Sequence, residues 1–259
     1  MQLIGIGIMH PAEERLKRLL PFIITTAKQQ VNVALEALER RKLSDDTRKI
    51  LKELLNEDDS ATVKKLTHSL NKIRRRMTSL APEHFDLAEE LYEAGGDTIG
   101  YVKATDAKDF KKGTNKKYIA LSYIHTGRMH VDDIAATVIH ELSHLILNTE
   151  DHAYSICMSK QASGLFTPWS VKELHSYARG KNSNPLNNAE TLSRIVLLIY
   201  FSVSKLAAYK KAYALYWESG DNKILAFHRM EPGQNPRISS PVLARKSNNL
   251  RIVNGHVVI

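Results

Sequence analysis

The sequence predicts an α+β fold that is mainly helical, with a small β-sheet placed before one central helix. Region 1–95 has apolar residues at three- and four-residue steps, the spacing of helices that bury one face. Two later segments, 98–104 and 117–124, alternate and are rich in Tyr, Ile and Val, as strands are. Helical spacing then returns. With 259 residues, 43% hydrophobic and 25% charged, the chain can bury a sizeable core.

The N-terminal region is expected to be all helical after a short apolar segment at 2–9, which is interpreted as a buried strand or an irregular segment. Helical patterns cover 12–19 and 21–41. Ser44 is a suitable N-cap for a helix through Leu55, because its hydroxyl can accept a backbone N–H at the helix start. Two further helices are predicted, from Ser60 to about Met77 and from Pro82 to Ala94.

Gly95 and Gly96 end the helical pattern, and the two predicted strands follow them. The segment DAKDFKKGTNKK, which joins the strands, has the Asp, Asn, Gly and Lys content of an exposed turn. A small sheet is therefore expected directly before the next helix.

That next helix is predicted to begin at 131–133 and to end near Leu147. At about 100° per residue, one arc of it is apolar and contains Val138. His140 and His144 fall on the opposite arc, with Glu141 at its edge. The two histidines are therefore expected to face away from the core stripe, as on a helix that forms the floor of a cleft.

Downstream, short helices are predicted over 152–162 and 169–178, and a long helix after Pro185 through about Trp217. Segment 224–230 is interpreted as a strand or a helical turn. The expected single domain covers 1–230, with a helical region at 1–95 and a region at 96–230 that contains the sheet, the central helix and the C-terminal helices. Residues 231–259, rich in Pro, Asn and Ser, are expected to be an extended or partly disordered tail.

The formal net charge of +9 favours loose attraction to anionic partners. The tight basic groups are Arg74–Arg76 and the lysines of 111–117, and no RNA- or DNA-binding motif accompanies them. They are interpreted as a solvated face, and no specific nucleic-acid partner is predicted. The longest apolar run, 195–203, is about half of a membrane span, so no transmembrane segment is expected.

The N-terminal segment has no positive charge before its apolar run and no small-residue cleavage site, unlike a secretory signal. The single cysteine, Cys157, excludes an intramolecular disulfide and fits a reducing compartment. The protein is therefore expected to be cytoplasmic as synthesised, and any export would use a route without a cleaved signal peptide.

His140, Glu141 and His144 form an H-E-x-x-H pattern. Two imidazoles four residues apart on a helix point the same way, so their ring nitrogens can meet one ion while the glutamate reaches its rim. The pattern predicts a catalytic zinc site. Zinc in hydrolases usually has three protein ligands and an open position for water. Asp151 and its neighbour His152 are the two candidates for the third ligand.

The segment HELSHLILNTEDHAYS resembles the deuterolysin and peptidyl-Lys metalloendopeptidase family, the aspzincins. The family signature is H-E-x-x-H followed by G-T-x-D-x-x-Y-G. Thr149, Asp151 and Tyr154 match its second element, whereas Asn148 and Ser155 replace the two glycines. Asn148 can adopt the left-handed conformation of a glycine, so that departure is mild.

This resemblance implies a zincin-like metallopeptidase with one Zn²⁺ held by His140, His144 and Asp151, and His152 as a bystander. It also implies that Glu141 is the general base of peptide hydrolysis and that Tyr154 assists the transition state. The protein is therefore predicted to be a zinc-dependent endopeptidase acting on peptide or protein substrates. Two alternatives are an effector or toxin that uses the same activity inside another cell, and a non-catalytic zinc-binding protein.

A second segment, NNAETL at 187–192, is similar to an Asn-Ala-Asp segment that follows the site in this family. The similarity implies that Asn187, Asn188 or Glu190 supplies hydrogen bonds around the metal ligands, as Thr149 would. An ordinary helix N-terminus is the alternative. Lysine-preferring members use acidic pocket residues, for which this sequence has four equal candidates. These are Asp106, Asp109, Asp132 and Asp133.

Overall fold

The computed structural model describes residues 10–89, 91, 99–102, 117–127, 129–157, 169–204 and 210, together with the strand segments 224–225, 251–253 and 256–258. Within these ranges the fold is α+β and mainly helical, as the sequence predicts. The predicted apolar segment at 2–9 lies outside the described residues, and so does the predicted domain boundary at residue 230.

The N-terminal region forms three helices, of which the first is longer than predicted. Helix α1 (Pro11–Leu38) runs without a break through Pro21. A proline inside a helix removes one backbone hydrogen bond. Here Leu20 and Ile23, on either side of Pro21, are buried, and this burial stabilises one continuous helix over the two predicted helical patterns.

Helices α2 (Asp45–Leu55) and α3 (Ser60–Met77) confirm the predicted ranges. Ser44 caps α2, because its Oγ accepts the backbone N–H of Thr47 at 3.1 Å. The cap of α3 is Asp59, whose Oδ1 accepts the N–H of Ala61 at 2.7 Å. The two caps fix where α2 and α3 begin, after short polar turns. These turns allow α1, α2 and α3 to fold back on one another.

The helix predicted from Pro82 is wrong. Pro82–His84 form one 3-10 turn (η1), and strand β1 (Phe85–Ala88) follows it. This strand pairs in parallel with β3 (Ile119–Ser122), and β2 (Gly100–Tyr101) pairs with the other edge of β3 in antiparallel fashion. Phe85 is buried, so sheet pairing and core contacts outweigh the helical propensity of the segment.

The predicted sheet before the central helix is confirmed, and the central helix follows as expected. A short helix, α5 (Tyr123–Thr126), connects β3 to α6 (Val131–Leu147). Asn148 ends α6 in the left-handed conformation, with φ 59° and ψ 40°. This is the conformation that a glycine would adopt at this position of the signature.

The next predicted helix, 152–162, is wrong in its described portion. Residues 156–157 form β4 (Ile156–Cys157), which pairs with β5 (Trp169–Ser170), and β5 pairs with β6 (Ile224–Leu225). Strand pairing with a distant segment is information that local spacing does not contain. The helix predicted over 169–178 is present in its second half as α7 (Lys172–Ala178).

The C-terminal helix α8 (Ala189–Val203) follows a 3-10 turn, η3 (Pro185–Asn187). Ser204, in an extended conformation, ends α8, so the predicted helix through Trp217 is interrupted there, and its remainder lies outside the described residues apart from Lys210. In the predicted tail, β7 (Arg251–Val253) and β8 (His256–Val258) pair as an antiparallel hairpin. The remainder of the tail lies outside the described residues.

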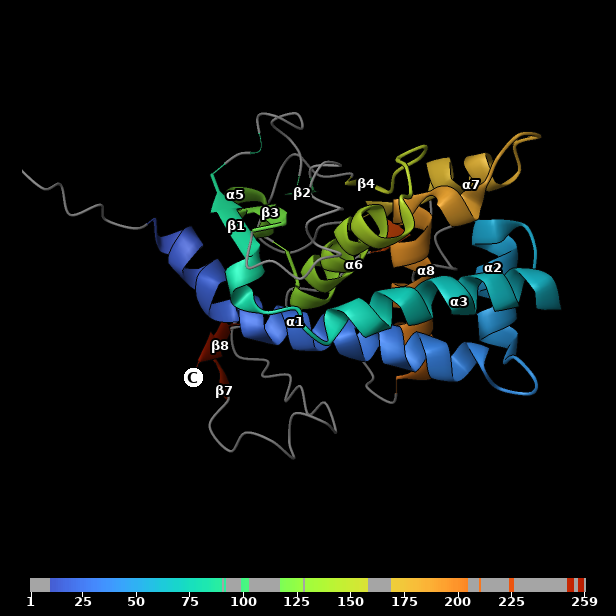
Figure 1. Ribbon diagram of the computed structural model, residues 1–259, viewed down its shortest axis with the longest axis horizontal. Helices are drawn as coiled ribbons and strands as arrows, with labels where there is room; N and C mark the ends of the chain where they lie inside the picture. Colours follow the sequence, from blue (N-terminus) through green and yellow to red (C-terminus); the bar gives the residue numbers. More distant parts are fainter. Residues whose placement is uncertain are drawn as a thin grey trace, which may run out of the picture.

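Helices α1, α6 and α8 contact one another and form the centre of the fold, with α3 packed against both α1 and α6. Figure 1 shows α3 alongside α1 and the small sheet at one end of the helical body. One buried apolar cluster extends from Leu16 in α1 to Ile199 in α8. Among the described residues, no helix is both long and apolar enough to cross a membrane. The core therefore packs α6 against both α1 and α8.

Candidate metal centre

Three side chains from α6 and the loop after it converge on one point. His140 Nε2 lies 3.1 Å from His144 Nε2 and 3.2 Å from Asp151 Oδ1, and His144 Nε2 lies 3.2 Å from Asp151 Oδ2. Ligand atoms about 2.1 Å from one tetrahedral ion are roughly 3.4 Å apart. The three residues therefore have the separation that ligands of a single small cation require, and they could hold a metal ion.

The hydrogen bonds of the two imidazoles show which nitrogen is free to bind. His140 Nδ1 lies 3.0 Å from Glu190 Oε2, and His144 Nδ1 lies 2.7 Å from the carbonyl oxygen of Thr149. Because both partners can only accept, both Nδ1 atoms carry hydrogen. In the neutral rings the Nε2 lone pairs then point at each other and at the Asp151 carboxylate. A proton or a metal ion can satisfy such a convergence of lone pairs, so the donor set fits a metal.

Asp151 reaches the histidines because the chain reverses after α6 and is fastened to the start of α8. The left-handed Asn148 turns the chain, and the N–H of Glu150 donates to the carbonyl oxygen of Asn187 at 2.8 Å. The side-chain oxygen of Asn188 accepts the N–H of His152 at 2.9 Å. The loop conformation is therefore set by backbone and amide contacts with α8.

Asp151 and His152, the two candidates for the third ligand, point in different directions. Asp151 faces both histidines, whereas His152 Nε2 lies 2.8 Å from Glu150 Oε2 and its ring stacks on Tyr177. Asn187 meets the loop through its backbone.

A buried polar network lies behind His140. Glu190 Oε1 accepts a hydrogen bond from Arg194 Nε at 2.8 Å and another from the Ser155 hydroxyl. Arg194 Nη1 lies 3.5 Å from Asp133 Oδ1 at the start of α6. Ser155, which replaces a glycine of the family signature, thus has a defined partner.

The polar arc of α6 is therefore less open than its sequence predicts. Asp133 contacts Arg194, and the side chains of His140 and Glu141 are buried. Asp132 is also buried, beside His130 and Gln30. Neither Asp132 nor Asp133 is therefore available to bind a basic substrate side chain. Asp106 and Asp109 lie outside the described residues.

Electrostatics within the cluster favour a bound cation. Burial acts against charge on His140, but hydrogen bonds with Asp151 and Glu190 outweigh it and raise its pKa to about 10. Burial likewise acts against the Asp151 carboxylate, yet the two histidines hold its pKa well below the usual range. Burial of Glu190 is offset mainly by Arg194, and the pKa of Glu190 is also low. Two carboxylates thus remain ionised beside His140.

Glu141 lies between the histidines in sequence and is buried beside the edge strand β2. Burial raises the pKa of its carboxyl group. A Cβ atom at Gly100 would lie 2.8 Å from Glu141 Oε1 and 2.7 Å from Thr137 Cγ2, closer than side chains tolerate. Only a glycine therefore lets β2 pass this close to Glu141 without displacement.

Tyr154 is an exposed member of the group. It is 45% exposed, Asp151 beside it is exposed as well, and the tyrosine ring stacks on that of His140 with centroids 6.3 Å apart. Burial of the hydroxyl and its hydrogen bond with Asp151 raise the pKa of Tyr154. The tyrosine hydroxyl is therefore a neutral donor beside the Asp151 carboxylate at neutral pH.

Sequence reasoning missed two contributors, Arg194 and Ser143. Ser143 shares a 2.8 Å hydrogen bond with the hydroxyl of Thr149 and donates to the carbonyl oxygen of His140, which ties the loop to α6. The signal for Arg194 is the Glu190–Arg194 pair, two opposite charges four residues apart inside an otherwise apolar helix.

Comparisons with known proteins assign no family. No family model matches the chain, and searches of curated proteins and of solved structures return no significant match.

Replacement of Asp151 by alanine should separate the two neighbouring candidates by metal affinity. Loss of a direct ligand should weaken Zn²⁺ binding more than the roughly 10–100-fold typical of outer hydrogen-bond partners. His152→Ala is the matched control, because that ring contacts Glu150 and Tyr177 instead. Competition with a chromogenic chelator measures both affinities, and equal losses would contradict the assignment of Asp151.

Metal binding should also release protons. In the metal-free protein at pH 7, His140 carries an extra proton because its pKa is raised to about 10, and a metal must displace that proton from Nε2. The apparent affinity should therefore fall about tenfold for each unit that pH drops below this pKa. Calorimetry of Zn²⁺ binding in buffers with different ionisation enthalpies counts the protons, and an affinity independent of pH would refute the expectation.

Proposed function

We propose that the protein is a zinc-dependent endopeptidase of zincin type. The observation that carries the proposal is the convergence of His140 Nε2, His144 Nε2 and an Asp151 carboxylate oxygen, with Glu141 on the same helix. Two imidazoles and one carboxylate form the donor set of many catalytic zinc sites and leave a fourth position for water or substrate. The aspzincin resemblance of 140–155 supports the same reaction.

A Zn²⁺ ion in this set would activate water and polarise the carbonyl group of a peptide bond. Glu141 would accept the proton of the attacking water and pass it to the leaving amine nitrogen. Burial raises the pKa of the Glu141 carboxyl group and so makes it a stronger base once ionised. A purely structural metal site requires no such group.

Tyr154 would hold the oxyanion that develops on the attacked carbonyl group. Its exposed side chain lies against His140, at the open side of the cluster, and its raised pKa keeps the hydroxyl protonated. Removal of one such donor typically costs about 3 kcal/mol of transition-state stabilisation. Glu190 would orient His140 and keep its Nε2 free through the Nδ1 hydrogen bond.

Glu141→Gln should keep zinc and abolish peptide cleavage, because the amide cannot accept the proton of water. The test digests a broad peptide library with the zinc-loaded chain, and mass spectrometry locates the cuts. His152→Ala should cleave normally, and chelation followed by zinc addition should remove and restore cleavage. A wild-type chain that binds zinc without cutting any peptide would favour the non-catalytic alternative, and cleavage by Glu141→Gln would remove Glu141 from the base role.

Gly100→Ala should lower turnover while zinc affinity stays near that of the wild type. The added methyl group displaces Glu141 or β2, and misplacement of a catalytic group by about 1 Å can cost on the order of 100-fold in rate. Thr137→Ser removes the closer of the two clashing atoms, Cγ2, so the double variant should regain some of the activity. Library digestion and chelator competition measure both quantities, and full activity in Gly100→Ala would contradict the role of this close approach.

A further inference from the structure

Helix α3 has a cationic face that is separate from the metal centre. Its 18 residues include no aspartate or glutamate and six basic residues. These are Lys64, Lys65, Lys72, Arg74, Arg75 and Arg76. At about 100° per residue, Lys64, Lys72 and Arg75 lie opposite the buried stripe of α3, and the other three basic residues lie at its sides. None of the six pairs with an acidic side chain within the ranges that the structure describes.

Some basic groups elsewhere in the fold contrast with this face. Arg48 and Lys52 of α2 each lie 3.7 Å from Asp58 Oδ2, and Arg179 lies 3.1 Å from Glu53 Oε2. Each of those cations therefore has an acidic partner within the fold, and Arg48 and Lys52 share one. The α3 cations are exposed to solvent, apart from the half-buried Arg76. Their charge is therefore available to bind an anionic partner.

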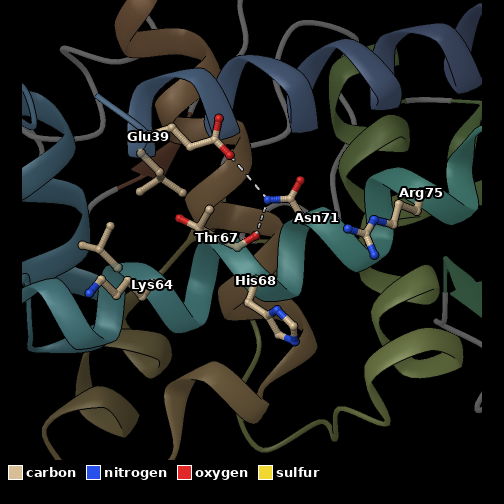
Figure 2. A pocket seen from close by; sticks show the side chains of 8 residues that line it. Glu39, Lys64, Thr67, His68, Asn71 and Arg75 are labelled. Carbon is tan, nitrogen blue, oxygen red and sulfur yellow. Dashed lines mark hydrogen bonds between the residues drawn. The ribbon is translucent and has the colours of Figure 1, made fainter. Parts of the chain in front are cut away.

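A groove of about 480 Å³ runs along α3 beside the end of α1. Lys64, His68, Asn71 and Arg75 line it at i, i+4, i+7 and i+11, one straight row on the helix. Figure 2 shows Lys64 and Arg75 at opposite ends of this row. Glu39 of α1 is the one acid among the lining residues, and Asn71 Nδ2 donates to its Oε1 at 3.4 Å. The groove is thus rich in hydrogen-bond donors and has net positive charge.

The composition of the face discriminates among anionic partners. The exposed large apolar side chains of the described residues are Tyr154 and Val203, and neither lies on α1 or α3. A protein interface or a membrane surface would need apolar or aromatic anchors here. Helix α3 also has no Phe, Tyr or Trp on which unpaired bases could stack, as single strands require. Duplex phosphates need only cations and donors.

We propose that the α3 face binds the phosphate backbone of double-stranded nucleic acid without reading its sequence. From Lys64 to Arg76 the face is about 18 Å long at 1.5 Å per residue, which matches roughly five base-pair steps. Contacts of lysine and arginine with phosphate position a protein on a duplex and carry no sequence information. This surface is independent of the proposed peptidase activity.

The test measures fluorescence anisotropy of a labelled 20-base-pair DNA duplex with the full-length chain over a range of salt concentrations. Lys64, Lys72 and Arg75 are changed together to glutamate, and a second variant has glutamine at the same three positions. Lys17, Arg18 and Lys181 changed to glutamate form the matched control, since these exposed residues lie off α3 and change the net charge equally. Circular dichroism and thermal unfolding verify that each variant is folded.

The α3 glutamate variant should bind the duplex at least about tenfold more weakly, and the magnitude of its salt slope should drop by about three. The glutamine variant should show the same direction, and the control should stay within about threefold of wild type. Equal loss in the control would overturn the proposal, because the attraction would then be that of net charge alone. Tighter binding of the single strand, of poly-glutamate or of anionic vesicles would also overturn it.

Discussion

The hydrogen bond between His140 and Glu190 is the contact on which the candidate metal centre depends. It joins α6 to α8 in the middle of the protein, at 3.0 Å, and leaves the other ring nitrogen of His140 free. Glu190 is buried and remains ionised because Arg194 is buried beside it, and Arg194 in turn contacts Asp133. A buried charge without its partner is strongly destabilising, so the members of this network require one another.

The same helix pair also shapes the loop that completes the cluster. Backbone bonds between Glu150 and the start of α8, and the amide of Asn188, hold the loop after α6 in place. Asp151 and Tyr154 consequently stand at the exposed side, while Glu141 is buried against β2. The centre combines a rigid buried half with an accessible half, which suits a reaction on a substrate that arrives from solvent. The cationic face of α3 is a separate surface with separate chemistry.

Local sequence patterns predicted the elements whose signals are local. The spacing of His140 and His144 and the caps at Ser44 and Asn148 all act within a few residues, and the corresponding helices are confirmed. The predicted helix after Pro82 is wrong because Phe85–Ala88 pair with a strand more than thirty residues away. The two helical patterns at 12–19 and 21–41 belong to one helix, because core burial stabilises α1 through Pro21. In both places tertiary contacts act against local propensity.

By itself, the sequence determined the helical character of the fold, the placement of a sheet before α6, and the two imidazoles on one face of that helix. It also limited the third ligand to Asp151 or His152. The family resemblance favoured Asp151, and the tertiary structure shows that Asp151 faces the histidines while His152 contacts Glu150, because the side-chain directions depend on how the loop is held against α8. It likewise revealed Arg194 behind Glu190 and the need for Gly100 beside Glu141. Such contacts mostly form between separate elements of the fold, so helical periodicity cannot predict them.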